Sequence, residues 1–354
     1  MFNEGITKRE GLIIKGIALI MMFFHHFFTF TEFYIDVISY PMLEQVFVFL
    51  QQPFKICVSV FAFLTGFFYY FNCNKNYRYS FKKIFNLWLT YFVCFIVLAV
   101  PAILTKKYEI NGIYFLLESI GFIRQVMCFC WYVIFYYIAM LIMPLFAKVD
   151  NENSVIALAI LIIVPNFLGV FTSRLNLENK VFQLVREVLE YTKWLPCVGS
   201  GYVFAKYNLL DKMFGLINEK NKVVKTIVFL PFIIIPFIAR GGNTFFDFIY
   251  APMFVFGILG IIRMIKREKL LRPFEHIGSA SLLMWFLHGA FFNVIGVYTK
   301  KILYFPKCPF LVLVWGLIVC YVVAISLRIP INWILKKANR LFNKVGINKK
   351  EENA

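Results

Sequence analysis

The chain has 354 residues, of which 61% are hydrophobic and only 16% are charged. A soluble domain has about a quarter of its residues charged, so this composition excludes one and predicts a polytopic helical membrane protein with a single membrane domain. The net charge of +18 does not indicate nucleic-acid binding, because Lys and Arg gather in short loops and at the C-terminus, as membrane topology predicts.

Ten apolar segments are candidates for membrane-spanning helices, so we expect an all-α bundle of about ten such helices. A helix needs about 20 residues to cross the bilayer core. The segments are 11–30, 53–71, 84–104, 126–147, 154–171, 189–205, 223–239, 245–265, 279–298 and 308–329. The segment 189–205 is weak, because Glu190 and Lys193 interrupt it. The stretch 110–123 is too short to span and predicts an interfacial or re-entrant helix.

The distribution of basic residues predicts the orientation of the bundle. Ten spans put both termini on one side, and the loops on that side carry about twice as many Lys and Arg as the opposite loops. The positive-inside rule therefore predicts cytoplasmic termini. We expect residues 8–330 to form the membrane domain and residues 331–354 to form a basic cytoplasmic tail near anionic lipid.

The first span contains Lys15 and two adjacent histidines, His25 and His26. Lys15 and His26 are eleven residues apart, so they lie on nearly one helix face and about 16 Å apart in depth. Ionisable groups in a membrane usually face the bundle interior or a wet cavity. This favours a polar path along the helix. The alternatives are a snorkelling lysine and a histidine with only a structural hydrogen bond.

Other polar residues in the spans have two interpretations each. His288 is about 14 Å deep if its helix begins near residue 279, which matches the depth of His26 and predicts a shared site, unless the match is coincidence. Lys55 could snorkel or line an outer cavity. Asp247 could orient a sugar hydroxyl or a histidine, or be a charge at a helix start. The eight scattered Cys include no CxxC pair, so we expect no metal site.

Basic residues at the predicted inner face include Lys82 and Lys83, at the start of the third span. A phosphorylated cytoplasmic donor would need such groups, because phosphate oxygens favour Lys and Arg. The positive-inside rule alone also explains them.

Five motifs in chain order resemble those of the acyltransferase 3 family of integral membrane acyltransferases. They are KGIALIMMFFHH (15–26), SVFAFLTGFFYY (59–70), YRYSFKKI (77–84), CWYV (130–133) and GSASLLMWFLH (278–288). The resemblance covers residues 8–330. It departs from the family's pattern at Lys15, where Arg is usual, and at Trp285, where Tyr is common. No SGNH-type domain follows, so we expect the standalone form.

The resemblance implies transfer of an acyl group, most often acetyl, from a cytoplasmic acyl-CoA to a hydroxyl of a cell-surface or exported glycan or lipid-linked saccharide. We expect this in a bacterial plasma membrane, with no permanently bound cofactor. It also implies that His26 acts as general base or transient acyl carrier, with Lys15, and more weakly Lys82 and Lys83, binding CoA. The residues expected to line the cavity are His25, Ser281, Trp285, His288 and Asp247.

The alternative function is a multi-pass transporter or flippase for a small organic or glycolipid substrate. In that case the same polar residues would line a permeation path. The sequence shows neither an inverted internal repeat nor a matched pair of interrupted short helices, which are typical of many transporters. A membrane sensor or scaffold is a further alternative, but it leaves the mid-membrane histidines unexplained.

Overall fold

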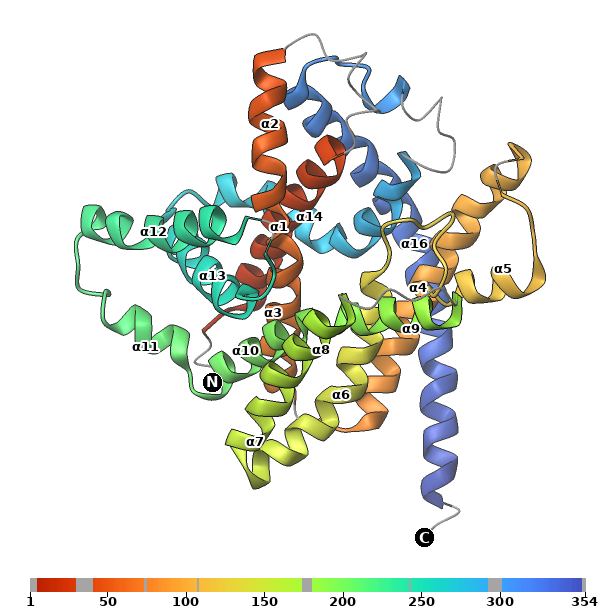
Figure 1. Ribbon diagram of the computed structural model, residues 1–354, viewed down its shortest axis with the longest axis horizontal. Helices are drawn as coiled ribbons and strands as arrows, with labels where there is room; N and C mark the ends of the chain where they lie inside the picture. The colour runs from red at the N-terminus through yellow and green to blue at the C-terminus, as the bar shows by residue number, and fades with distance from the viewer. Residues whose placement is uncertain are drawn as a thin grey trace.

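A computed structural model describes residues 5–29, 41–72, 75–106, 108–173, 180–241, 243–291 and 301–351. These residues form helices and no strands (Figure 1). Within them, seven helices are long and apolar enough to cross a membrane. They are Lys8–Thr29, Gln45–Tyr70, Tyr77–Leu104, Tyr132–Glu152, Lys222–Arg240, Asp247–Met264 and Pro309–Leu341. The chain is a multi-pass membrane protein, whereas the total of about ten spans and the cytoplasmic termini stay predictions.

The longer helices carry the labels of Figure 1. The N-terminal half contains α1 (Lys8–Thr29), α2 (Pro41–Phe54), α3 (Cys57–Tyr70), α4 (Tyr77–Leu104), α5 (Gly112–Ser119), α6 (Tyr132–Glu152), α7 (Ser154–Leu158) and α8 (Val164–Ser173). The C-terminal half contains α9 (Lys180–Tyr191), α10 (Leu195–Lys206), α11 (Leu209–Gly215), α12 (Lys222–Arg240), α13 (Asp247–Met264), α14 (Glu268–His288) and α16 (Pro309–Glu351).

Helices α1 and α14 run parallel and in close contact at the centre of the bundle. A side chain at Gly16 or Gly278 would collide with the backbone of the other helix, so the two backbones touch directly. Small residues allow this close approach in membrane helices. At their N-terminal ends, Arg9 bonds to Glu275 at 3.0 Å and to Glu268 at 3.3 Å. These contacts fix the register of α1 against α14.

Helices α3 and α10 form a second pair of this kind. A side chain at Gly66 would meet the backbone of Val198, and one at Gly201 would meet the backbone of Phe63. The segment around α10, predicted as the weak span 189–205, is divided. It comprises the end of α9, the short 3-10 turn Thr192–Trp194 and α10. Its contact with α3 places it inside the bundle.

Several predicted spans differ from the helices observed. Residues 126–131 form turns and α6 begins at Tyr132, so the prediction of a helix at the start of 126–147 is wrong. The span predicted at 53–71 is part of a longer segment that breaks at Lys55 and Ile56, between α2 and α3. The span predicted at 154–171 is divided by a π-helical segment, Ala159–Ile163.

The last two predicted spans have different bounds. The ninth, at 279–298, begins earlier, because α14 starts at Glu268 and ends at His288; residues 292–298 lie outside the described part. The tenth continues far beyond residue 329, because α16 runs unbroken to Glu351. The helix therefore crosses the expected boundary between domain and tail at residue 331, and that division stays a prediction.

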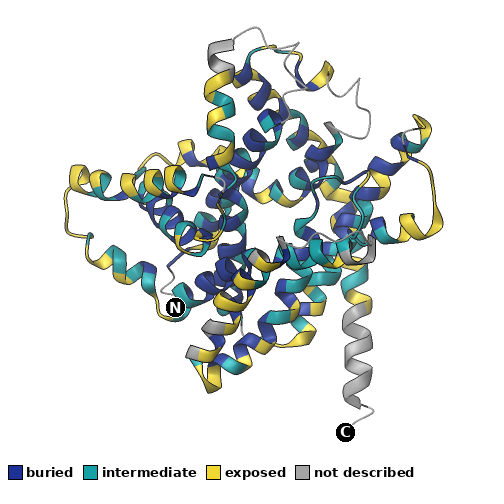
Figure 2. Cartoon of the chain, viewed as in Figure 1, coloured by how far each residue is buried: buried dark blue, intermediate teal, exposed yellow. Residues whose placement is uncertain are grey.

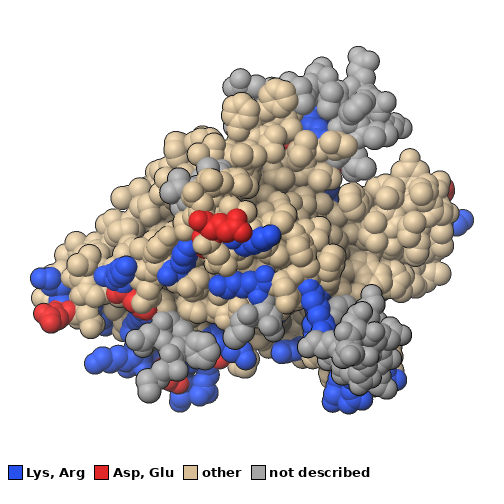
Figure 3. Space-filling view, turned by 90° about the horizontal axis from the view of Figure 1, so that it is seen from below, with Lys and Arg blue, Asp and Glu red and all other residues tan. Residues whose placement is uncertain are grey.

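The surface divides into an apolar part and a basic part. Buried residues concentrate in the central helices, whereas α12 at one side is largely exposed (Figure 2). Most of its exposed side chains are apolar, including Val223, Ile227 and Ile238, as suits a helix against lipid. Lys and Arg outnumber Asp and Glu on the face seen from below (Figure 3).

Candidate active site

A cavity of about 490 Å³ lies between α1, α3, α4, α6 and α14. It brings together residues that are far apart in the sequence. Of the residues predicted for the site, those that line it are Lys15, His25, His26, Lys83, Ser281 and Trp285. Lys82, His288 and Asp247 are not among its lining residues. The roles predicted for all these residues stay predictions.

The imidazole ring of His26 is packed between other rings in the cavity wall. Its centroid lies 4.2 Å from that of Phe129, 4.9 Å from that of His288 and 5.0 Å from that of His25. Nδ1 of His26 is buried and has no hydrogen-bond partner among the described residues. These contacts hold the ring in place by packing, and among the described residues no structural hydrogen bond engages its Nδ1.

His288 supports His26 from behind the cavity wall. Its Nδ1 donates a hydrogen bond to the carbonyl of Trp285, because a carbonyl can only accept. In a neutral ring, Nε2 then carries the lone pair, and this atom is buried without a partner among the described residues. The ring also stacks on Phe129, with centroids 5.3 Å apart and an interplanar angle of 19°.

The prediction that His26 and His288 lie at a similar depth is confirmed, because their rings are in contact. The helix start near residue 279, on which that prediction was based, is wrong. Since α14 begins at Glu268, His288 lies about 30 Å along its helix instead of 14 Å. His26 lies about 27 Å along α1, and the two helices are parallel with adjacent starts. The two histidines therefore meet at equivalent positions near the C-terminal ends of their helices.

His25 connects α1 to α2. Its Nδ1 donates to the carbonyl of Gln51 at 2.8 Å, and the hydroxyl of Thr29 donates to Oε1 of the same residue at 2.6 Å. The tautomer of His25 is thereby fixed, with Nδ1 protonated. His25 is buried and also lines the cavity, so it has a structural bond on one side and faces the cavity on the other.

One end of the cavity carries Lys15 and Lys83, which together we call the donor end. The Lys15 ammonium lies 5.7 Å from the centroid of Phe68, and that of Lys83 lies 5.3 Å from the centroid of Tyr79. Among the described residues, no salt bridge involves either lysine. Their charges face the cavity without a carboxylate partner.

A buried carboxylate orders the turns that carry Phe129, and the sequence did not reveal this. Glu118 accepts hydrogen bonds from the backbone N–H groups of Val126 and Met127. Burial raises the pKa of its carboxyl, against the opposing effect of these hydrogen bonds. The thiol of Cys128 also donates to the carbonyl of Gly289, 3.8 Å away. A lone Glu in the apolar stretch 110–123 was the only sequence signal for this contact.

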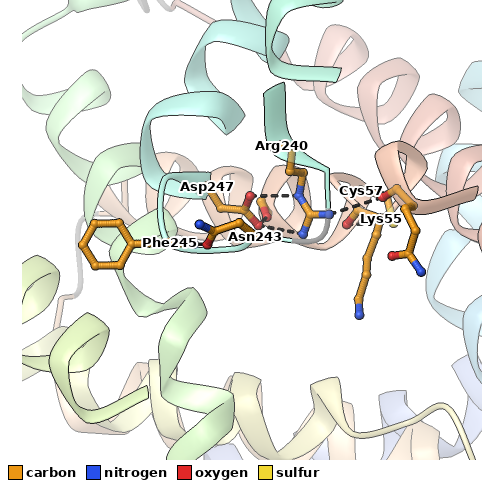
Figure 4. Close-up of polar contacts among 8 residues, drawn as sticks. Lys55, Cys57, Arg240, Asn243, Phe245 and Asp247 are labelled. Carbon is orange, nitrogen blue, oxygen red and sulfur yellow. Dashed lines mark hydrogen bonds and ion pairs between the residues drawn. The ribbon is translucent and has the colours of Figure 1, made fainter. Parts of the chain in front are cut away.

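Asp247 forms a buried ion pair outside the cavity. Its carboxylate binds Arg240 through two contacts of 2.8 and 3.0 Å and accepts a hydrogen bond from the hydroxyl of Ser59 (Figure 4). Arg240 also donates to the carbonyl of Gln52 at 3.4 Å. The pair joins the end of α12 to the start of α13, and its further bonds connect both to α2 and α3. Both oxygens of Asp247 are therefore occupied by protein groups.

Taken together, the fold and the site define a multi-pass helical membrane protein with an internal cavity that contains histidine and lysine. Residues 13–333 match the family model of an acyltransferase domain, Acyl_transf_3. The chain belongs to the acyltransferase 3 family, as its motifs predicted, and is a membrane acyltransferase. Neither a curated protein nor a solved structure matches it.

Proposed function

We propose that the protein transfers an acyl group, acetyl in the first instance, from a cytoplasmic acyl-CoA to a hydroxyl of a cell-surface or exported glycan. The main support is the position of His26 in the wall of a cavity that has two lysines at its donor end. We further propose that it works in a bacterial plasma membrane, with its termini in the cytoplasm.

The chemistry needs a base and a place for a developing oxyanion. A neutral imidazole is available at physiological pH, because the unperturbed pKa of histidine is about 6.5. In the proposed reaction, His26 takes the proton of the acceptor hydroxyl while its oxygen attacks the thioester carbonyl carbon. The carbon–sulfur bond then breaks, and the CoA thiolate leaves and regains a proton. A second route has His26 itself carry the acyl group transiently.

The donor end suits the phosphates of CoA. Lys15 and Lys83 supply positive charge that no carboxylate of the described cavity wall neutralises. Lys15 is about 16 Å from His26 along α1, so an extended pantetheine arm can run between the lysines and the imidazole. Ser281 and Trp285 of α14 lie along the same wall. Lys82 does not line the cavity, so we propose that it contributes less to CoA binding than Lys15 and Lys83 do.

The test replaces His26 by alanine and follows transfer of labelled acetyl from acetyl-CoA to surface glycan. Membranes with equal amounts of folded protein are compared, with His276→Ala as control, because His276 is an exposed histidine of α14. Loss of a general base costs about 10²–10⁴-fold in rate, so we expect at least a hundredfold loss. Undiminished acetylation by the His26 variant would overturn the assignment. Failure of the purified wild type to hydrolyse or exchange acetyl-CoA would favour a transporter.

A further inference from the structure

A third lysine lines the cavity, at the opposite end from Lys15 and Lys83. Lys55 lies in the turn between α2 and α3, where its backbone N–H donates to the carbonyl of Gln52 at 3.1 Å. Its ammonium group points away from the Arg240–Asp247 pair (Figure 4). His25, which bonds to Gln51 in the same part of α2, lines the cavity beside it.

The two charged ends of the cavity are well separated. Lys15 lies over the ring of Phe68 in α3, whereas Lys55 precedes Phe68 by thirteen residues at the other end of that helix. The helical part between them, from Cys57 to Phe68, spans about 16 Å. A donor whose phosphates lie at Lys15 and Lys83 therefore leaves the charge of Lys55 free for another ligand.

No carboxylate of the described structure neutralises Lys55. The nearby acid, Asp247, is held by Arg240 and Ser59. Among the described residues, Lys55 forms no ion pair, and neither Asp nor Glu lines the cavity. Two further cations, Lys193 and Arg240, act on the Lys55 ammonium, and the opposing effect of the Asp247 carboxylate is smaller than either. A partly buried ammonium in such surroundings is costly unless an anion joins it.

Aromatic side chains line the same cavity as Lys55. Trp131 lines the cavity and stacks on Trp194 at 4.4 Å and on Tyr191 at 5.3 Å between ring centroids. The ammonium of Lys193 lies 4.5 Å from the centroid of Trp194. An aromatic face can pack against the C–H face of a sugar ring, while an ammonium can bind an anionic substituent of that sugar. We call Lys55, His25 and Trp131 the acceptor end.

We propose that the acceptor end binds a saccharide that carries an anionic group, carboxylate or phosphate, close to the hydroxyl that is acylated. Lys55 pairs with the anion and Trp131 packs against the sugar ring. That this end binds the acceptor depends on the proposed acyl transfer, in which the donor occupies the other end. The preference for an anionic sugar rests on Lys55 and its surroundings alone.

The test measures binding, independently of any reaction. The full-length protein in lipid nanodiscs is titrated by calorimetry with cellobiose, cellobiuronic acid and cellobiose 6-phosphate, which are neutral, carboxylated and phosphorylated probes. The variants are Lys55→Gln and, as a matched control, Lys212→Gln, an exposed lysine of α11. A charge-assisted hydrogen bond corresponds to about a tenfold or greater change in affinity. We expect at least one anionic probe to bind about tenfold more tightly than cellobiose in the wild type and in Lys212→Gln.

We expect Lys55→Gln to lose this preference while it still folds, as judged by its unfolding temperature. The stronger anionic probe tells whether the group is a carboxylate or a phosphate. Equal binding of all three probes, no binding of any, or an unchanged preference in Lys55→Gln overturns the proposal. Acyl transfer that proceeds equally well to neutral and anionic sugars overturns it too, but leaves the proposed function intact. If the protein prefers the anionic probe but transfers no acyl group to any sugar, the proposed function is overturned and the anion-binding proposal stands.

Discussion

The rings of His26 and His288 lie 4.9 Å apart between centroids, although they come from α1 and α14, which are far apart in the sequence. Phe129 packs against both rings. His288 is anchored by its bond to the carbonyl of Trp285, whereas Nδ1 of His26 has no partner among the described residues. One histidine is thus fixed and the other is held only by packing, which suits a supporting role for His288 and a reactive role for His26.

His288→Gln tests the supporting role. Removing the ring takes away the contacts that orient His26, and small misplacements of a catalytic group are expensive. We expect kcat for acyl transfer to fall by about 10–100-fold with little change in the KM for acyl-CoA. The measurement is steady-state kinetics on purified protein, with His276→Gln as the matched control in the same helix. A KM effect without a kcat effect would contradict this role.

Lys82 and Lys83 are neighbours in α4, but we expect their substitution to affect binding of acyl-CoA differently. Lys83 lines the cavity and Lys82 does not. If the donor end binds CoA phosphates, Lys15→Gln and Lys83→Gln should each raise the KM for acyl-CoA by about tenfold, with kcat nearly unchanged. Lys82→Gln should change KM much less. Equal effects of the two α4 variants would show that general surface charge, not the cavity, attracts the donor.

The direct contact of α1 with α14 predicts that its glycines cannot be enlarged. Gly278→Ala places a methyl group against the backbone of Leu12, so one helix must move. Overpacking of this kind costs about 1–3 kcal/mol. We expect a lower unfolding temperature in detergent. Gly215→Ala is the matched control, because a side chain there meets open space. Equal unfolding temperatures for the two variants would show that α1 and α14 do not pack as described.

Part of the site could be predicted because it depends only on local helix geometry. Lys15 and His26 share one helix, so their spacing fixes a common face and a depth difference. The cavity is lined by both residues. The apolar segment 279–298 likewise predicted that His288 lies in a helix, and His288 is the last residue of α14. Its helix start was wrong because Glu268 to His276 are too polar to read as a membrane helix.

The rest of the site depends on contacts between distant segments, which periodicity does not reveal. Phe129 contacts His26 from the turns that precede α6. The sequence did not predict these turns, because residues 126–147 form one continuous apolar run. Asp247 pairs with Arg240 across the loop that joins α12 and α13. The sequence placed Asp247 at a helix start but gave no sign that Ser59 and Arg240 would occupy its oxygens.

Glu118 gives a prediction that depends on pH. Burial raises the pKa of its carboxyl, so the folded protein binds the proton more tightly than the unfolded chain does. Stability from this group is therefore present at low pH and falls as the pH rises from the ordinary glutamate value through the raised one. Glu118→Gln keeps an acceptor oxygen for Val126 and carries no titrating group. We expect its unfolding temperature to change less than that of the wild type between about pH 5 and pH 8.

Two further variants complete the experiment on Glu118. Glu118→Ala removes the acceptor and leaves the N–H of Val126 unpaired, which costs about 1–3 kcal/mol and frees the turns that hold Phe129 against His26. We expect lower stability at every pH and slower acyl transfer. Glu219→Gln, at an exposed position, is the control and should keep the pH dependence of the wild type. If Glu118→Gln kept that dependence too, another group would be responsible for it.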